Sequence, residues 1–308
     1  MLEVRHISFS YSNESVINSV GFTLAKGQNL ALIGESGCGK STLLKLIYGL
    51  YDLDQGEIFW NENQVLGPKF HLVPGMPYMK YLAQDFDLMP FITVAENVGK
   101  YLSNFFPEEK KARILELLEV VEMSEFANTK AKFLSGGQMQ RVALAKVLAL
   151  EPEVLLLDEP FSHIDNFRKN SLRRRIFSYL KSKNITCILA THDVNDSLSF
   201  ADEILVMKDG AIEAKGTPKT IFQNPSSFYV ASLFGAVSVI KMNDTTKFVY
   251  PYQFQLVPNS DIQVEVVQSY FKGSHFLVEG KFENQFVFFE SLKELSSGEV
   301  VFLEVKEG

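Results

Sequence analysis

Short, largely apolar runs bounded by polar or glycine-rich sequence recur in the first two thirds of the chain. Residues 30–33, 154–157 and 185–189 are such runs. Continuous apolar runs of this length are typical of strands that are buried on both faces of a parallel sheet. After the first run, residues 42–50 carry apolar side chains at helical spacing, at Leu43, Leu44 and Ile47. Strands that alternate with helices predict an α/β fold.

Helix signals accumulate between residues 86 and 140. Thr93 and Glu96 form a capping box, in which each side chain accepts a hydrogen bond from a backbone N–H at the helix start. Pro107, followed by two glutamates, opens a second helix. The apolar positions of that helix are Ile114, Leu117, Leu118 and Val121. These signals predict a helical subdomain over about residues 86–140.

The pattern changes to a period of two in the last quarter of the chain, where Phe and Val alternate with polar residues. The alternating segments are residues 262–266, 276–278, 286–288 and 301–305. Turns are predicted at residues 272–273, 279–280 and 297–298, each of which contains a glycine. Five or so short strands with aromatic side chains alternating inward predict a small antiparallel β-barrel.

Composition and charge narrow the choice of partners. The 308 residues are 46% hydrophobic, which suffices for one large and one smaller core. We therefore expect two domains, residues 1–235 and 236–308. The net charge of −7 argues against nucleic acid as a partner, because such binding depends on clustered basic side chains. The one basic triplet, residues 173–175, is predicted to be a solvated helix face.

The sequence shows no targeting or membrane-spanning segment. The first residues lack the basic and apolar regions of a signal peptide, and no stretch approaches the roughly 18–20 apolar residues of a membrane span. We expect the chain to stay in the cytosol and to reach a membrane only through a partner. Cys38 and Cys187 form neither a metal-binding pattern nor a plausible pair, so both are expected to be reduced thiols.

Residues 34–42 follow the first apolar run and read G-E-S-G-C-G-K-S-T, which contains the phosphate-loop pattern G-x-x-x-x-G-K-[ST]. Glycines let consecutive backbone N–H groups turn around phosphate oxygens. Lys40 is predicted to neutralise the β- and γ-phosphates, and Ser41 to offer its hydroxyl to Mg²⁺ at a helix start. The residues predicted to bind a nucleoside triphosphate are Gly34, Glu35, Ser36, Gly37, Cys38, Gly39, Lys40, Ser41 and Thr42.

Two further motifs restrict the kind of nucleotide-binding protein. Residues 134–138 read L-S-G-G-Q before a helical run over residues 142–150. Ser135 and Gln138 fit a capping box, but that interpretation leaves Gly136 and Gly137 without a reason, because each lowers helix propensity by about 1 kcal/mol. Exposed backbone at this helix start predicts a second anion site.

The third motif is a pair of carboxylates that follow a buried strand. Residues 158–160 read D-E-P directly after the apolar run 154–157. Ligands of open α/β sheets bind beyond the carboxyl ends of the strands. Asp158 is therefore predicted to hold Mg²⁺ through water, and Glu159 to act as general base for the attacking water. Two acidic side chains that are merely solvated at a strand end are the alternative.

The phosphate loop, L-S-G-G-Q, D-E-P and Thr191-His192-Asp193, in this order, resemble the ATP-binding cassette (ABC) ATPases. The resemblance covers about residues 1–235. It implies hydrolysis of ATP with Mg²⁺ as cofactor. It also implies a P-loop (RecA-like) core with an antiparallel β-layer and a helical subdomain.

The resemblance assigns further roles to matching residues. Tyr11 stands where the family has an aromatic that stacks on adenine, with a core or rim tyrosine as the alternative. Gln84 matches the glutamine that touches Mg²⁺ and water and links the site to a transmembrane partner. His192 matches the histidine at the γ-phosphate, and Asp165 matches the aspartate of the loop that crosses the dimer interface. The resemblance thus implies Glu159, His192 and Gln84 as catalytic residues and Ser41, Gln84 and Asp158 as metal ligands.

The resemblance also implies an assembly. Two copies of the chain are expected to sandwich two ATP molecules head to tail, with Ser135, Gly136, Gly137 and Gln138 of one copy on the nucleotide of the other. This homodimer would drive transmembrane permease subunits, one helix of which docks between Gln84 and the helical subdomain. The candidates for lining that groove are Met89, Pro90, Phe91 and Tyr101. Ordinary core packing of these four residues is the alternative.

The last quarter of the chain separates branches of the family. It resembles the OB-like module attached to ATPases of binding-protein-dependent importers, although Tyr250-Pro251 stands where that module often has Arg-Pro. We therefore expect an importer subunit, peripheral at the cytoplasmic face of the inner membrane, that works indirectly with a solute-binding protein. An exporter subunit and a soluble cassette ATPase acting on nucleic acid or ribosomes are the alternatives. The transported solute, a regulatory ligand for the barrel and the role of residues 61–77 stay open.

Overall fold

The computed structural model describes residues 1–12, 14–242 and 245–306. Its contacts divide the chain into two compact units, Met1–Lys219 and Thr220–Gly308. This division lies before the boundary expected at residues 235/236, because the intervening segment packs with the second unit. The ring of Phe222 stacks on Tyr250 with the centroids 4.6 Å apart, and the Tyr250 hydroxyl donates to the carbonyl of Ala231. Whether these units are also functional domains stays a prediction.

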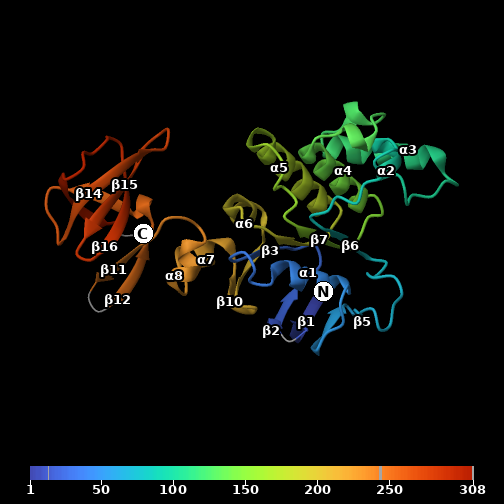
Figure 1. Cartoon of the computed structure of the whole chain (residues 1–308), viewed down its shortest axis with the longest axis horizontal. Coiled ribbons are helices and arrows are strands. Elements are labelled where there is room, and N and C mark those ends of the chain that lie inside the picture. Colours follow the sequence, from blue (N-terminus) through green and yellow to red (C-terminus); the bar gives the residue numbers. More distant parts are fainter. Residues whose placement is uncertain (13, 243–244, 307–308) are drawn as a thin grey trace. The chain divides into compact units, whose positions relative to one another are not determined.

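A six-stranded sheet forms the centre of the first unit (Figure 1). Its strand order is β10-β9-β3-β8-β7-β6, and all neighbours are parallel except β10, which runs antiparallel to β9 at one edge. The strands are β3 (Asn29–Ile33), β6 (Met79–Leu82), β7 (Val154–Asp158), β8 (Thr186–Ala190), β9 (Glu203–Lys208) and β10 (Ala211–Gly216). The predicted parallel sheet is thus present.

Burial on both faces explains the continuous apolar runs of this sheet. In β7, Leu155 and Leu157 belong to one hydrophobic core, whereas Val154 and Leu156 belong to a second core on the opposite face. Successive side chains of a strand point to opposite faces. An apolar side chain is therefore favoured at every position of β7, and the strand carries no polar face.

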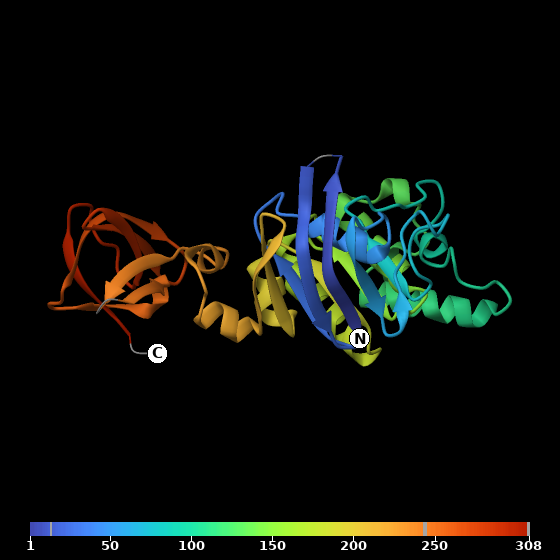
Figure 2. The ribbon, with the colours of Figure 1, turned by 90° about the horizontal axis from the view of Figure 1, so that it is seen from below.

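An antiparallel layer of four strands encloses the second of these cores. Its order is β2-β1-β4-β5, and Figure 2 shows the long ribbons of β1 and β2 in blue. The strands are β1 (Leu2–Tyr11), β2 (Glu14–Leu24), β4 (Gln55–Trp60) and β5 (Asn63–Gln64). Trp60, the only tryptophan of the chain, is buried beneath this layer with the apolar face of helix α1 (Lys40–Tyr48). The layer thereby holds the helix that follows the phosphate loop.

Helices cover the other face of the central sheet (Figure 1). They are α2 (Val94–Val98), α3 (Pro107–Val120), α4 (Gly136–Leu148), α5 (Asn166–Ser182), α6 (Val194–Phe200) and the 3₁₀ turns η1 (Ser124–Phe126) and η2 (Ala131–Phe133). The predicted capping boxes of Thr93 with Glu96 and of Ser135 with Gln138 are both present. No helix in the described part of the chain has the length and apolar character that crossing a bilayer requires.

The division between the units falls within α7 (Pro218–Gln223), and the second unit continues with α8 (Phe228–Ser232) and antiparallel strands. β11 (Ser238–Met242) pairs with β12 (Thr245–Val249). After the short turn η3 (Pro251–Gln253), five strands form a sheet in the order β13-β17-β14-β15-β16. Its strands are β13 (Phe254–Val257), β14 (Ile262–Phe271), β15 (Phe276–Phe282), β16 (Gln285–Ser291) and β17 (Val300–Val305). This agrees with a small antiparallel β-unit.

Two details of this unit differ from the sequence-based expectation. Residues 279–280 lie inside β15 and form no turn. A Cβ on Gly280 would lie 2.2 Å from Cγ1 of Val264, so the glycine permits close packing between strands. In β16 the buried apolar positions are Val287 and Phe289, whereas Phe286 is exposed, so not all aromatic side chains of the alternating segments point inward.

Candidate nucleotide site

The phosphate loop leaves the end of β3 and closes at the start of α1, two residues before the predicted helix start. Gly34, Gly37 and Gly39 have φ angles of 151°, 85° and 105°, which residues with a Cβ rarely adopt. A Cβ on Gly34 would lie 2.3 Å from the carbonyl oxygen of Met207, whereas a Cβ on Gly37 would meet no atom within 4 Å. The backbone thus curves around an open space, as the glycine pattern predicts.

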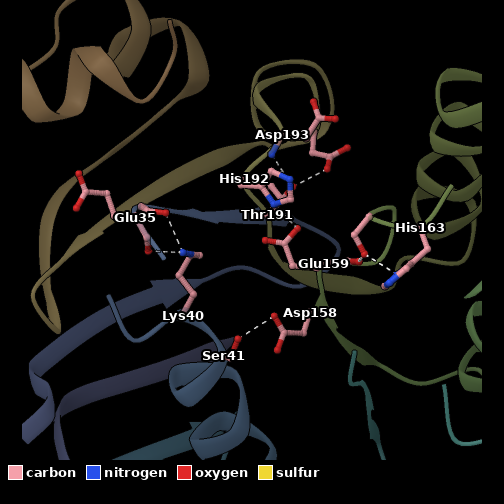
Figure 3. Close-up of polar contacts among 12 residues, drawn as sticks. Glu35, Lys40, Ser41, Asp158, Glu159, His163, Thr191, His192 and Asp193 are labelled. Atoms are coloured by element: carbon pink, nitrogen blue, oxygen red, sulfur yellow. Dashed lines mark hydrogen bonds and ion pairs between the residues drawn. The ribbon is translucent and has the colours of Figure 1, made fainter. Parts of the chain in front are cut away.

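Lys40 and Ser41 lie at the start of α1, where Lys40 points to the phosphate loop and Ser41 points to Asp158 (Figure 3). The ammonium group of Lys40 donates to the carbonyls of Gly34 and Glu35, both at 2.8 Å. The Ser41 hydroxyl donates to Oδ1 of Asp158 at 3.0 Å. The phosphate loop and the carboxylate at the end of β7, which are more than a hundred residues apart, therefore meet at one place.

A cavity of about 290 Å³ lies at this edge of the sheet. It is lined by Val16, Gly34, Ser36, Gly37, Gly39, Lys40, Ser41, Thr42, Gln84, Asp158, Glu159 and His192. Strands β3, β7 and β8 end here in parallel, and such carboxyl ends are where open α/β sheets bind ligands. The fold therefore brings together the predicted residues from four separate sequence segments.

Glu159 and His192 both line the cavity and lie in contact with each other (Figure 3). Nδ1 of His192 lies 2.7 Å from Oε2 of Glu159, and 73% of the His192 side chain is exposed against 17% of Glu159. The backbone of Glu159 has a φ of 51° and is held by a hydrogen bond from its N–H to the carbonyl of Ala190. The left-handed backbone conformation costs a residue such as glutamate about 1–3 kcal/mol, and such strain concentrates at functional sites.

Other predicted ligands of the nucleotide do not line this cavity. Ser135, Gly136, Gly137 and Gln138 form the first turn of α4, and Asp165 precedes α5. Tyr11 packs edge-on against Phe9 and Tyr51, and its hydroxyl lies 3.5 Å from Oγ1 of Thr42. Of the phosphate-loop residues, Glu35 contributes its carbonyl to Lys40, and Cys38 is a buried free thiol.

Gln140, which the sequence-based prediction missed, joins the L-S-G-G-Q helix to Glu159. It is 3% exposed, and its Nε2 donates to the carbonyl of Glu159 at 2.9 Å. Its Oε1 accepts from the N–H of His163 at 3.0 Å. A buried amide that is satisfied on both sides fixes the backbone it contacts. The signal in the sequence was a glutamine among the apolar positions of α4.

The sequence predicts that the basic triplet forms a solvated helix face, but only two of its three side chains are solvated. Arg174 and Arg175 are exposed, whereas Arg173 is 2% exposed. Nε of Arg173 lies 2.5 Å from Oδ1 of Asp196, where the two atoms form an ion pair whose geometry is not that of a hydrogen bond. A terminal guanidinium nitrogen of Arg173 donates to Asp193. The apolar packing of α5 against the sheet draws this position inward, where the two carboxylates after His192 compensate its charge.

These carboxylates hold the loop that carries His192. The side chain of Thr191 donates to Oδ2 of Asp196 at 2.7 Å and accepts from the N–H of Asp193 at 3.0 Å. Burial raises the pKa of Asp196 above its usual value, although Thr191 and Arg173 oppose this effect. For Asp193, burial also acts to raise the pKa, but hydrogen bonds from Arg173 and Asn195 outweigh it and lower the pKa.

A second cavity, of about 620 Å³, lies next to the segment that carries Gln84. Its walls come from α1, residues 73–77, residues 80–83 and 85–87, and α4, together with Tyr101 and Leu150. Of the four residues predicted to line a groove here, only Tyr101 does so. Met89 and Phe91 are exposed outside it, and Pro90 has its carbonyl bonded to the N–H of Lys132. Residues 73–77, which had no predicted role, line it instead.

Comparisons with known proteins give relatives of one kind. Residues 17–162 match the model of the ABC transporter family. The Fe(3+) ions import ATP-binding protein FbpC 2 of Haemophilus influenzae is 34% identical over 79% of this chain and 69% of its own. The spermidine/putrescine import ATP-binding protein PotA of Pasteurella multocida is 33% identical over 80% of this chain, and the chain spans 66% of that relative's length.

Solved structures agree with these relatives. A dimeric post-hydrolysis state of the ATP-binding cassette MJ0796, bound to ADP and Pi, matches 71% of this chain and 99% of its own, with a TM-score of 0.63 and 28% identity. CbiO1 of Clostridium perfringens, part of an ABC transporter complex, matches 72% of this chain and 90% of its own, with a TM-score of 0.64 and 27% identity. The chain therefore belongs to the ATP-binding proteins of the ABC transporter family.

Proposed function

We propose that this chain is the ATP-hydrolysing, energy-coupling subunit of a membrane importer. The observation that carries the proposal is the convergence of Lys40, Ser41, Asp158, Glu159 and His192 on one cavity. Each side chain type matches a step of phosphoryl transfer, which requires positioning and stabilisation of charge more than covalent chemistry. The relatives support the importer branch, because FbpC and PotA are import ATP-binding proteins.

Magnesium fits the oxygen atoms of this cavity. The Ser41 hydroxyl and a carboxylate oxygen of Asp158 lie 3.0 Å apart, and both are oxygen ligands of the kind Mg²⁺ prefers. Among the described residues, no group of three or more His, Cys, Asp or Glu side chains could hold a metal ion. A Mg²⁺ ion that keeps water and substrate phosphates as ligands needs only one or two protein groups. When bound, the ion neutralises charge on the β- and γ-phosphates.

The chain's own residues then divide the work. Lys40 stabilises charge on the terminal phosphates, and Gln84, which lines the same cavity, orients water and the metal ion. Glu159 takes the proton of the attacking water, a step typically worth about 10²–10⁴-fold in rate. His192, which contacts Glu159 through Nδ1, also contacts the γ-phosphate. Tyr11, close to Thr42 on α1, stacks on the adenine.

We further propose that a second copy of the chain completes each site. Ser135 to Gln138 expose a helix start outside the cavity of their own chain, so they are free to bind the γ-phosphate held by a partner copy. Asp165, exposed before α5, lies at the interface between the copies. The related cassette MJ0796 was solved as a dimer bound to ADP and Pi. Hydrolysis removes the phosphate that bridges the two copies.

The 620 Å³ cavity is the proposed docking place of a permease helix. It adjoins the segment that carries Gln84, so a helix bound there contacts the same segment that lines the nucleotide cavity. We therefore propose that the ATPase dimer binds transmembrane permease subunits at the cytoplasmic face of the inner membrane. A solute-binding protein takes part only through those subunits.

Affinity purification of the tagged chain from detergent-solubilised membranes of its native host tests this function. A multi-span permease and a solute-binding protein are expected to co-purify, and Mg²⁺-dependent phosphate release by the purified complex is expected. Recovery only from the soluble fraction with ribosomal or DNA-repair proteins would refute the importer assignment. Recovery with the permease but without phosphate release would refute the enzymatic role.

Alanine at Gly136 and at Gly137 should separate packing from nucleotide contact. A Cβ on Gly137 would lie 2.7 Å from the carbonyl oxygen of His163, whereas a Cβ on Gly136 would meet no atom within 4 Å. We expect Gly137→Ala to lower the free energy of unfolding by about 1–3 kcal/mol through overpacking. Gly136→Ala should not lower it, because alanine favours the helix by about 1 kcal/mol.

Both variants should nevertheless lose ATP-dependent dimerisation, which light scattering measures. Denaturant unfolding followed by selectively excited tryptophan fluorescence reports on the first unit alone, because its Trp60 is the only tryptophan. A stable Gly136→Ala protein that dimerises and hydrolyses ATP as well as the native chain would argue against nucleotide contact at this helix start.

A further inference from the structure

Tyr81 lies between the two cavities of the first unit. It is in β6 and lines the 620 Å³ cavity, which Asp158 does not reach. Asp158 lines the nucleotide cavity, which Tyr81 does not reach. Yet the Tyr81 hydroxyl donates to Oδ2 of Asp158 at 3.2 Å. One hydrogen bond therefore connects the wall of one cavity to the wall of the other.

The two oxygens of Asp158 have different partners. Oδ1 accepts from Ser41, which faces the phosphate loop, and Oδ2 accepts from Tyr81 on the opposite side. Asp158 is 4% exposed, so the orientation of its carboxylate depends on these protein donors. A donor on Oδ2 fixes the rotation of the carboxylate and leaves Oδ1 directed at the position where Ser41 and a metal ion meet.

Tyr81 is suited to orient Asp158, because its phenol hydroxyl donates the hydrogen bond and an ionised carboxylate can only accept one. Partners that orient a metal-binding side chain typically change metal affinity by about 10–100-fold when they are removed.

The ring of Tyr81 continues toward the segment 73–77. It contacts the ring of Tyr48 with the centroids 5.6 Å apart, and Tyr48 lies at the end of α1. Gly75 packs directly on Tyr48, because a Cβ at residue 75 would lie 2.3 Å from Cζ of that ring. All three residues line the 620 Å³ cavity. A displacement of residues 73–77 can therefore reach Asp158 through a series of side chains in contact with one another.

We propose that Tyr81 is a positioning residue for Asp158, and that it transmits the state of the 620 Å³ cavity to the magnesium site. The proposal rests on the proposed function, since it takes Asp158 as the residue that holds the metal. No sequence motif assigns a role to Tyr81. The proposal also gives residues 73–77 a part in the coupling of the two cavities.

The first test compares Tyr81→Phe with Tyr48→Phe. Each change removes one hydroxyl from the same cavity wall and keeps the ring, but only Tyr81→Phe removes a donor to Asp158. Binding of ADP is titrated calorimetrically in EDTA and at graded Mg²⁺ concentrations. In EDTA, we expect the ADP affinity of Tyr81→Phe to lie within about 2-fold of the native affinity. The variant should need about 10-fold more Mg²⁺ to reach half of the Mg²⁺-dependent gain in ADP affinity. Tyr48→Phe should match the native chain in both.

The readout distinguishes positioning from a general loss of structure. Equal weakening with and without Mg²⁺, or a native Mg²⁺ requirement in Tyr81→Phe, would overturn the inference and leave the proposed function standing. A native chain whose ADP affinity does not respond to Mg²⁺ would overturn both.

The second test is a double-mutant cycle with Gly75→Ala. The added methyl group should push Tyr48 and raise the Mg²⁺ requirement in the native background, but not in the Tyr81→Phe background. Gly298→Ala is the control, because Gly298 also has a positive φ of 83° but no atom within 4 Å of a Cβ, and it lies in the second unit. Additive effects, or no effect of Gly75→Ala, would overturn transmission from the 73–77 segment.

Discussion

Glu159→Gln is expected to abolish almost all ATP hydrolysis while the protein still binds ATP and dimerises. The amide keeps the size of the side chain and an acceptor for His192, whose Nδ1 lies 2.7 Å from Oε2 of Glu159. It cannot take a proton from water, so phosphate release should fall by about 10²–10⁴-fold. Phosphate release at saturating ATP measures the loss, and calorimetry measures the ATP affinity. Light scattering should show that the ATP-bound dimer persists.

Glu153→Gln is the matched control on the same segment. Glu153 lies just before the opposite end of β7, where it forms a salt bridge with Lys26 at 3.1 Å. Exposed pairs of this kind contribute little stability. Hydrolysis by this variant should stay near the native rate. If Glu159→Gln hydrolysed ATP within about threefold of the native chain, a proton-transfer term of the expected size would be absent and Glu159 would not be the base.

The backbone at Glu159 makes this comparison cleaner. The residue has a φ of 51°, and glutamine meets the same steric cost in that conformation. The carbonyl of Glu159 accepts from Gln140, and that bond is independent of the side chain at 159. A change in rate without a change in unfolding therefore reports on the carboxylate and not on the strained backbone.

The sequence predicted those parts of the site that depend on local order. Gly34, Gly37 and Gly39 identify the phosphate loop because their positive φ angles are a local backbone requirement. The apolar runs before Asp158 and Thr191 predict strands that are buried on both faces, and parallel strands place their ends side by side. The cavity follows from these two features together.

Contacts between distant segments were not predictable in the same way. Tyr81 resembles any aromatic of a buried strand, and its role appears only when β6 pairs with β7 and brings the hydroxyl to Asp158. The segment 73–77 shows turn residues, but which wall it builds depends on tertiary packing. The sequence predicts a turn at Gly280, which instead lies inside β15, because a glycine gives the same sequence signal in a turn and in a closely packed strand.

Arg173→Met is expected to give the largest loss of stability of any single change considered for this chain. The Arg173 side chain is 3% exposed and that of Asp196 is 2% exposed, so the methionine would leave a buried carboxylate without its cation. Breaking one partner of a buried pair typically costs about 3–5 kcal/mol. Denaturant unfolding followed by Trp60 fluorescence measures this loss. Arg174→Met is the control, because Arg174 is exposed on the same helix and should change stability by less than about 0.5 kcal/mol.

The dependence of this loss on pH identifies its cause. Burial already raises the pKa of Asp196, and removing Arg173 withdraws an opposing charge, so the folded-state pKa should rise further. A carboxyl whose pKa is higher in the folded state than in the unfolded state destabilises the fold above its unfolded pKa, and the penalty disappears as it becomes protonated. The stability difference between Arg173→Met and the native chain should therefore shrink as the pH falls from 8 toward the pKa of the carboxyl groups. A difference that is constant with pH would assign the loss to packing of the arginine stem on Phe161 instead, over whose ring the guanidinium lies at 5.6 Å.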